Sequence, residues 1–166
     1  MSINNPILFP QIVTFVSNLN SDAISPERKL ILQPLIEFIQ IKVSTHQEIR
    51  LIFICTHNSR RSHLAQIWSQ TMAAYFSIKN VNSYSVGTEN TAVYSMVINA
   101  LKNTGFQIET LSKGENPVYS IKFAQNQHPV IAFSKKLDTV FNPNSEFAAI
   151  MTCSQADGGC PFIFGA

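Results

Sequence analysis

The chain changes character twice between residues 50 and 75, and this stretch constrains the fold more than any other. Residues 50–55, RLIFIC, are almost entirely apolar, β-branched or aromatic, which is typical of a strand buried on both faces of a sheet. Five polar residues then lead to Arg61, and apolar residues from Leu64 to Tyr75 recur at helical spacing. A strand, a short polar loop and an amphipathic helix are therefore predicted in this order.

The rest of the chain continues the alternation of strands and helices. Further strands are predicted at residues 81–87, 117–123, 129–135 and 147–153. A helix is predicted from Ala92 to Thr104, and Gly105 is placed to end it. This order predicts a three-layer α/β fold with a mostly parallel central sheet. Ligands of such sheets bind at the carboxyl ends of the strands, where Cys55 and Cys153 are both expected.

The first 48 residues are predicted to form a helical extension packed on the same domain. Residues 10–19 place their apolar side chains on one helical face. A second helix is expected to begin after Ser25, a good N-cap, with Pro26 at its first position. Pro34 is expected to kink this helix because its ring removes one backbone donor. A scaffold or interface role is expected for the extension.

Composition argues against several classes of protein. The 166 residues suffice for one domain, and a net charge of +2 gives no reason to expect nucleic acid or an anionic membrane as partner. Apolar runs reach about five residues, far short of the roughly 20 that span a bilayer. The N-terminus lacks the basic region of a signal peptide. Three cysteines without secretory signals indicate a cytoplasmic, reducing environment.

The loop from Cys55 to Arg61 has the properties of an anion site. A tight loop that closes onto a helix start directs backbone N–H groups and the helix dipole toward one point. Arg61 adds a guanidinium that can hold two oxygens of a tetrahedral oxyanion, and Ser62 could donate a hydrogen bond to a Cys55 thiolate. Asn58 is expected to brace the loop with its amide. The predicted substrate contacts are contiguous: Thr56, His57, Asn58, Ser59, Arg60, Arg61 and Ser62.

The alternative interpretation is that Cys55 is a buried core residue at a strand end and that the arginines are surface charges. The spacing of a cysteine, five residues and an arginine occurs often by chance. Its position between a hydrophobic strand and an amphipathic helix favours the functional interpretation, because structural context is what confirms a short motif.

The stretch FICTHNSRRSHLAQ resembles the signature of the low-molecular-weight protein tyrosine phosphatases and the related arsenate reductases, which reads approximately C-T-G-N-S-C-R-S. Residues 84–89, YSVGTE, are similar to the SAGT segment after the second strand of that family. The resemblance covers roughly residues 49–166. It implies a four-stranded parallel sheet flanked by helices, Cys55 as the nucleophile and Arg61 as the residue that holds the oxyanion.

Two residues of the loop depart from this signature. His57 stands where the family has glycine, so a left-handed backbone at His57 would be strained. His57 is either an ordinary loop residue or a pH-sensitive contact to the oxyanion. Arg60 replaces a frequent second cysteine of the family, which makes the loop more basic and removes one possible redox partner.

A second pair of cysteines, Cys153 and Cys160, encloses six residues in the segment TCSQADGGCP. Four ligands at zinc spacing are absent from the sequence, and a permanent disulfide is not expected in the cytoplasm. The thioredoxin-coupled arsenate reductases have a very similar segment. That resemblance implies that Cys55 is arsenylated, that Cys153 displaces arsenite and forms a disulfide with Cys55, and that Cys160 passes the disulfide to a thioredoxin-like reductant.

Three functions remain open at this point. The first is reduction of arsenate by the Cys55, Cys153 and Cys160 cascade, and the second is hydrolysis of phosphomonoesters through a phosphocysteine at Cys55. The third is a non-catalytic oxyanion-binding or thiol redox-sensing module. No bound cofactor or metal is expected, and phosphate, sulfate or arsenate is the expected occupant of the loop.

The sequence lacks one group that both enzymes of the family use. They protonate the leaving oxygen with an aspartate in an Asp-Pro loop that is followed by a last helix, and no Asp-Pro occurs here. Asp138 and Asp157 do not have the expected context. The chain is therefore expected to be either an incomplete form that lacks this loop and helix or a homologue with slow turnover.

Overall fold

The computed structural model describes residues 8–159 and 163–166 and has an α/β architecture. The helices are α1 (Pro10–Ser17), the 3-10 helix η1 (Ser21–Ala23), α2 (Pro26–Ser44), α3 (Arg61–Tyr75), α4 (Ser95–Thr104) and α5 (Ser154–Gly159). The strands are β1 (Ile49–Cys55), β2 (Val81–Gly87), β3 (Gln107–Ser112), β4 (Val118–Lys122), β5 (Val130–Ala132) and β6 (Ala148–Met151).

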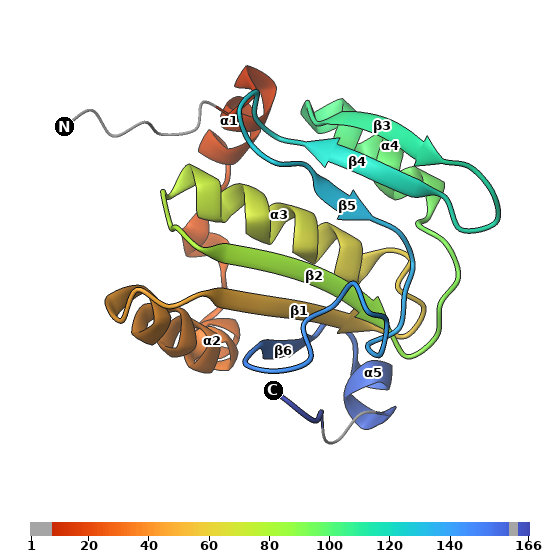
Figure 1. Cartoon of the computed structure of the whole chain (residues 1–166). Coiled ribbons are helices and arrows are strands. Elements are labelled where there is room, and N and C mark those ends of the chain that lie inside the picture. The colour runs from red at the N-terminus through yellow and green to blue at the C-terminus, as the bar shows by residue number, and fades with distance from the viewer. Residues whose placement is uncertain (1–7, 160–162) are drawn as a thin grey trace.

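The strands form two separate sheets (Figure 1). One is parallel with the order β2-β1-β6, and the other is antiparallel with the order β3-β4-β5. The α/β class is confirmed, but the four-stranded parallel sheet is not, because the parallel sheet of the described residues has three strands. Residues 113–117 and 123–129 are too short for the crossover that parallel pairing requires, so β3, β4 and β5 pair as hairpins.

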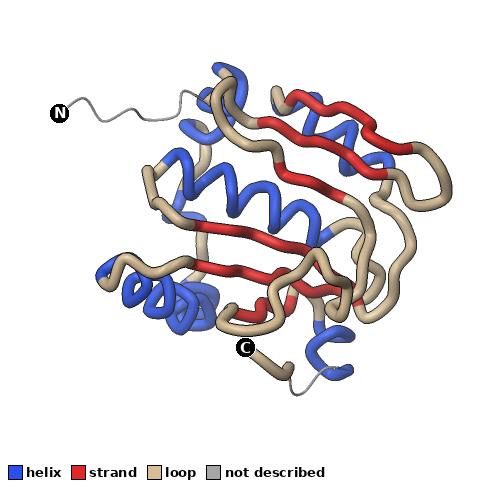
Figure 2. Tube along the Cα trace, in the orientation of Figure 1, coloured by secondary structure: helices blue, strands red, loops and turns tan. Residues whose placement is uncertain are grey.

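Strand β3 is not among the strands predicted from the sequence. All of its residues are exposed except Ile108, which is half-buried. A strand that buries neither face needs no alternation of apolar and polar residues, so its sequence lacks the pattern by which strands are predicted. The segment after β5 turns back toward the parallel sheet, where Lys136 forms a single parallel bridge with Gly87 at the end of β2. The loop after the antiparallel sheet therefore reaches the carboxyl edge of the parallel one (Figure 2).

Helix α3 lies between the two sheets. On one side it packs Ile67 into a core formed with α1, α4, β4 and β5. On the other side Ala65 and Ala73 pack with Leu51 and neighbouring residues of β1. The opposite face of the parallel sheet is covered by Phe147, Leu137 and Ile163 from loops and by Ala156 of α5.

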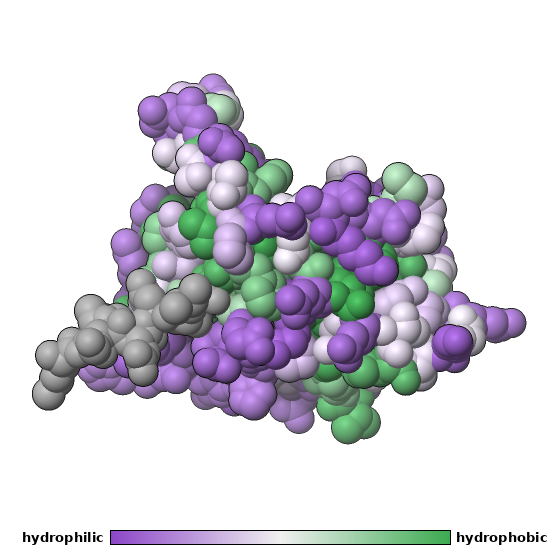
Figure 3. All heavy atoms as spheres, turned by 90° about the horizontal axis from the view of Figure 1, so that it is seen from above, coloured by the Kyte–Doolittle hydropathy of each residue, from purple (hydrophilic) through white to green (hydrophobic). Residues whose placement is uncertain are grey.

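The N-terminal helices attach to this framework to different degrees. Helix α1 buries Ile12 and Val16, whereas other apolar residues of its predicted face, such as Phe15, are exposed. Helix α2 begins as predicted, with the Ser25 hydroxyl accepting from the Arg28 N–H at 3.2 Å, and it contains Pro34. No residue of α2 is fully buried. On the face of the molecule seen from above, hydrophobic residues lie among hydrophilic ones (Figure 3). None of the described helices is long and apolar enough to cross a membrane.

Candidate functional site

A pocket of about 310 Å³ opens at the carboxyl edge of the parallel sheet. Cys55 ends β1, Gly87 ends β2 and Cys153 follows β6, so three strand ends meet at this edge. The residues that line the pocket are Cys55, Thr56, His57, Ser59, Arg60, Arg61 and Thr91. The predicted site residues Asn58 and Ser62 are buried instead of lining the pocket.

Asn58 and Ser62 form a hydrogen-bond chain that ends at the Cys55 sulfur. The backbone N–H of Lys135 donates to Asn58 Oδ1 at 2.8 Å, and Asn58 Nδ2 donates to Ser62 Oγ at 2.9 Å. Ser62 Oγ lies 3.0 Å from Cys55 Sγ. Because Ser62 already accepts a hydrogen bond from Asn58, its own proton is free to point at the sulfur, where it would stabilise a thiolate.

The left-handed residue of the loop is Asn58 and not His57. Asn58 has a φ of 42°, whereas His57 is not among the residues with positive φ. The strain expected at His57 is therefore absent. Asparagine adopts this conformation more readily than most residues, and its two amide hydrogen bonds fix it there.

Gly87 allows the segment after β2 to lie directly against the loop. A Cβ at this position would lie 2.7 Å from Asn58 N and 2.8 Å from Thr56 O, and it would also collide with Glu89 O. The Thr56 carbonyl accepts from the Glu89 N–H at 2.8 Å and from Thr88 Oγ1 at 3.1 Å. Only glycine permits this approach, so the glycine of YSVGTE positions the loop.

The other side of the loop is held by residues that the sequence did not point to. The His57 carbonyl accepts from Thr91 Oγ1 at 3.0 Å and from Ser134 Oγ at 3.2 Å. Asn116, from the β3–β4 connection, exchanges two hydrogen bonds with the backbone of Ser134. These residues are distant in sequence and have no motif, so only the fold could reveal them.

His63 is buried and contacts the loop as a neutral imidazole. Its Nε2 lies 2.9 Å from the Asn58 carbonyl, which can only accept, so Nε2 carries the proton. Its Nδ1 then accepts from Ser85 Oγ at 3.0 Å. Burial, reinforced by the charge of Lys135, lowers the pKa of His63 to about 3. This residue follows the motif directly, but nothing in the sequence indicated its role.

Positive charge gathers at the start of α3. Arg61 is the first residue of the helix and lines the pocket. The guanidinium of Arg60 lies over the ring of Tyr94, 5.3 Å from its centroid. Two permanently charged side chains and the helix N-terminus therefore share one opening with Cys55, which suits a tetrahedral oxyanion.

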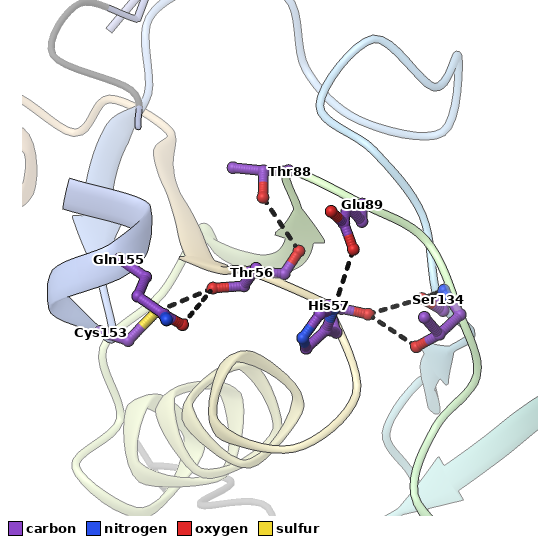
Figure 4. A network of polar contacts seen from close by, with 8 residues as sticks. Thr56, His57, Thr88, Glu89, Ser134, Cys153 and Gln155 are labelled. Atoms are coloured by element: carbon purple, nitrogen blue, oxygen red, sulfur yellow. Dashed lines mark hydrogen bonds and ion pairs between the residues drawn. The ribbon is translucent and has the colours of Figure 1, made fainter. Parts of the chain in front are cut away.

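Cys153 lies beside the same loop. Its Sγ is 3.6 Å from Thr56 Oγ1, which also lies 3.4 Å from Gln155 Oε1 (Figure 4). Burial raises the pKa of the Cys153 thiol, but the Ala156 N–H, the contacts with Thr56 and the charge of Arg61 outweigh it, so the pKa lies below its usual value. Both Cys55 and Cys153 are free thiols.

The remaining candidates do not join the pocket. Cys160 lies outside the described residues. Asp138 and Asp157 are exposed and do not line the pocket. In the described part of the chain, no three His, Cys, Asp or Glu side chains come together as a metal site.

The fold and the site together define an α/β protein with a buried cysteine in a pocket that two arginines also line. No family model matches the chain, and no curated protein matches it.

Proposed function

We propose that this chain is a cysteine enzyme of tetrahedral oxyanions and that its reaction is the reduction of arsenate to arsenite. The observation that carries the proposal is the position of Cys153, a second thiol of lowered pKa beside the loop of Cys55. A phosphatase of this kind needs one cysteine, whereas a reductase needs a second thiol within reach of the first. The resemblance of TCSQADGGCP to the thioredoxin-coupled arsenate reductases agrees with this choice.

The first step uses the pocket as it stands. The Cys55 thiolate attacks the arsenic atom, an S–As bond forms, and an As–O bond breaks with its electron pair leaving on oxygen, which is protonated to water. Arg61 and the loop N–H groups hold the remaining oxygens. Ser62 stabilises the thiolate before attack through its hydroxyl.

The second step transfers two electrons to arsenic. The Cys153 thiolate attacks the Cys55 sulfur, the S–S bond forms, and the S–As bond breaks with its pair going to arsenic, which leaves as arsenite. Cys160 then attacks Cys153 and releases Cys55. A thioredoxin-like dithiol reduces the Cys153–Cys160 disulfide, and this requirement for reduced thiols suits a cytoplasmic location.

A paired assay tests the proposal. Arsenate-dependent oxidation of reduced thioredoxin is measured in the wild type, in Cys55→Ser, in Cys153→Ser and in the control Glu109→Gln, an exposed change on β3. We expect activity in the wild type and the control and none in the two cysteine variants. Full arsenate reduction by Cys153→Ser would rule out the cascade.

A second candidate function is the hydrolysis of phosphomonoesters through a phosphocysteine at Cys55. The volume of the pocket favours it, because about 310 Å³ lies at the lower end of small-molecule sites of about 300–1,000 Å³ and leaves room for an organic leaving group. Hydrolysis that survives in Cys153→Ser, without arsenate reduction in the wild type, would establish this function. If arsenate protects Cys55 from an alkylating reagent, but neither arsenate reduction nor phosphomonoester hydrolysis is detected, the chain is instead an oxyanion-binding module.

A further inference from the structure

Both proposed reactions need a proton donor for the leaving oxygen. Among the described residues that line the pocket, none is an aspartate or a glutamate. Cys55 is the proposed nucleophile, and a guanidinium group does not serve as a proton donor in general acid catalysis. Histidine is the side-chain type that exchanges protons near neutral pH, and His57 is the histidine of this lining.

His57 is paired with a carboxylate at the mouth of the pocket. Its Nδ1 lies 3.1 Å from Glu89 Oε2, and Figure 4 shows the Glu89 side chain directed at the ring. Across residues 8–159 and 163–166, no hydrogen bond occupies the other ring nitrogen, Nε2. A carboxylate that accepts from Nδ1 fixes the tautomer and the orientation of the ring, so that Nε2 is left to exchange a proton with a ligand.

Both members of the pair are anchored to the nucleophile loop. The His57 carbonyl is held by Thr91 and Ser134, and the Glu89 N–H donates to the Thr56 carbonyl at 2.8 Å. The backbones of both residues are therefore held at the Cys55 loop, and the side chains, which are 55% and 64% exposed, are held by their contact with each other. A fixed donor beside the reacting atoms is what proton transfer in a transition state requires.

The charges around the ring come from two parts of the chain. Glu89 approaches from the segment after β2, and Arg60 and Arg61 lie at the start of α3. The segment after β5 contacts His57 through the uncharged Ser134. Glu89 therefore contacts the ring, while Arg60 and Arg61 line the same pocket as His57.

We propose that His57 is the general acid of this site and that Glu89 is the residue that positions it. This inference rests on the proposed function and holds for either of its reactions. When the Cys55 thiolate forms the S–As or S–P bond, the As–O or P–O bond breaks with its electron pair on oxygen. That oxygen takes the proton of His57 Nε2, while Glu89 remains ionised. In ester hydrolysis the neutral ring then takes a proton from the water that attacks the phosphocysteine.

The inference also gives a reason for a departure from the family signature. A histidine stands on the loop where the resembled family has glycine, and YSVGTE supplies a glutamate in the segment that contacts this loop. The proton donor is thus built into the nucleophile loop and its neighbour.

The test compares leaving groups, because a general acid matters most for an oxygen that leaves poorly. We measure kcat/KM for phenyl phosphate and 4-nitrophenyl phosphate, and single-turnover disulfide formation with arsenate in the Cys160→Ser background. Variants are His57→Asn and Glu89→Gln, with His128→Asn and Glu115→Gln as matched exposed controls. Phosphate protection of Cys55 from alkylation shows in each variant that the loop is intact.

We expect His57→Asn to lower the rate with phenyl phosphate or arsenate about 100-fold and the rate with 4-nitrophenyl phosphate only several-fold. Glu89→Gln should also lower the rate with phenyl phosphate more than the rate with 4-nitrophenyl phosphate, because the ring then loses the carboxylate that orients it. Equal losses on both esters, or no loss, would overturn the role of His57 while leaving the proposed function intact. A wild type that turns over neither arsenate nor phosphomonoesters would overturn both.

Discussion

At the scale of single residues, Asn58 links the Cys55 loop to the rest of the molecule. It is fully buried, holds a left-handed backbone and links the Lys135 N–H to Ser62. Its side chain and its backbone therefore make separable contributions, because glycine tolerates the backbone conformation and alanine does not.

Two substitutions separate these contributions. Asn58→Gly should lower the free energy of unfolding by about 1–3 kcal/mol, because the buried Lys135 N–H and the Ser62 hydroxyl lose partners. Asn58→Ala should lower the free energy of unfolding by roughly 1–2 kcal/mol more, because alanine disfavours the left-handed backbone. Urea unfolding followed by Trp68 fluorescence measures both. Equal values for the two variants would contradict the conformation assigned to Asn58.

Lys135 is a second residue whose burial has a measurable consequence. It is 2% exposed, its ammonium lies 4.6 Å from the centroid of the Phe133 ring, and burial lowers its pKa to about 8. The folded state binds this proton more weakly than the unfolded state does. Stability should therefore rise with pH between about 8 and 10.5, since the unfolded chain then holds more protons.

Lys135→Met should abolish this rise and should stabilise the protein at pH 7 by about 1 kcal/mol, because methionine fills similar space without a desolvated charge. The substitution keeps the backbone N–H of residue 135, which donates a hydrogen bond to Asn58 Oδ1. The matched control is Lys136→Met, an exposed neighbour. Thermal unfolding measured from pH 7 to 10.5 tests this prediction. If the stability of Lys135→Met still rises with pH over this range, another group is responsible for the rise.

At the scale of elements, the outer edge of β2 is closed by side chains of α3. The Gln70 amide donates to Val81 O at 2.8 Å and accepts from Ser83 N at 3.0 Å, as a neighbouring strand would. Gln66 Nε2 donates to Ser83 O at 3.0 Å. These glutamines satisfy an edge that would otherwise present unpaired backbone groups.

Gln70→Ala should consequently lower the free energy of unfolding by about 1–3 kcal/mol and speed hydrogen exchange at the Ser83 N–H. Gln33→Ala, on the exposed surface of α2, serves as the control and should have little effect. Hydrogen exchange followed by NMR gives both rates. Unchanged protection at Ser83 would mean that the glutamine does not stabilise the edge.

Some of these elements could be predicted from the sequence and others could not. The strand that ends at Cys55, the helix from Arg61 and the strand that ends at Gly87 follow from hydrophobic pattern, and Gly105 ends α4 with a φ of 105° as expected. The exposed β3 has no such pattern. Ser134 holds the Cys55 loop, and Asn116 holds Ser134. These residues come together only through the packing of the second sheet, and no local sequence pattern predicts that packing.

At the scale of the whole molecule, the Cys55 loop lies where the segment after β5 meets the parallel sheet. The segment after β5 donates to the loop through Lys135 and accepts from Gly87 N at 2.9 Å, so both sheets depend on the same contacts. His63 lies beneath this junction and is 0% exposed. Global stability and the geometry of the site are therefore coupled.

His63 makes that coupling depend on pH. Its folded pKa is about 3 against a usual value of 6.5, so the unfolded chain binds more protons between these values and stability falls as the pH falls from about 6.5 toward 3. The loss should reach roughly 3 kcal/mol at pH 4. Urea unfolding in His63→Gln should show a flatter dependence, and an equally steep one would assign acid sensitivity to other groups.

The central claim is that Cys55 reacts with an oxyanion within reach of Cys153. The most direct measurement is peptide mass spectrometry of Cys160→Ser protein after treatment with arsenate, because this variant cannot pass the disulfide onward. We expect about one Cys55–Cys153 disulfide per molecule with arsenate and none with sulfate. Free thiols after arsenate treatment, or the same disulfide in sulfate, would contradict the account.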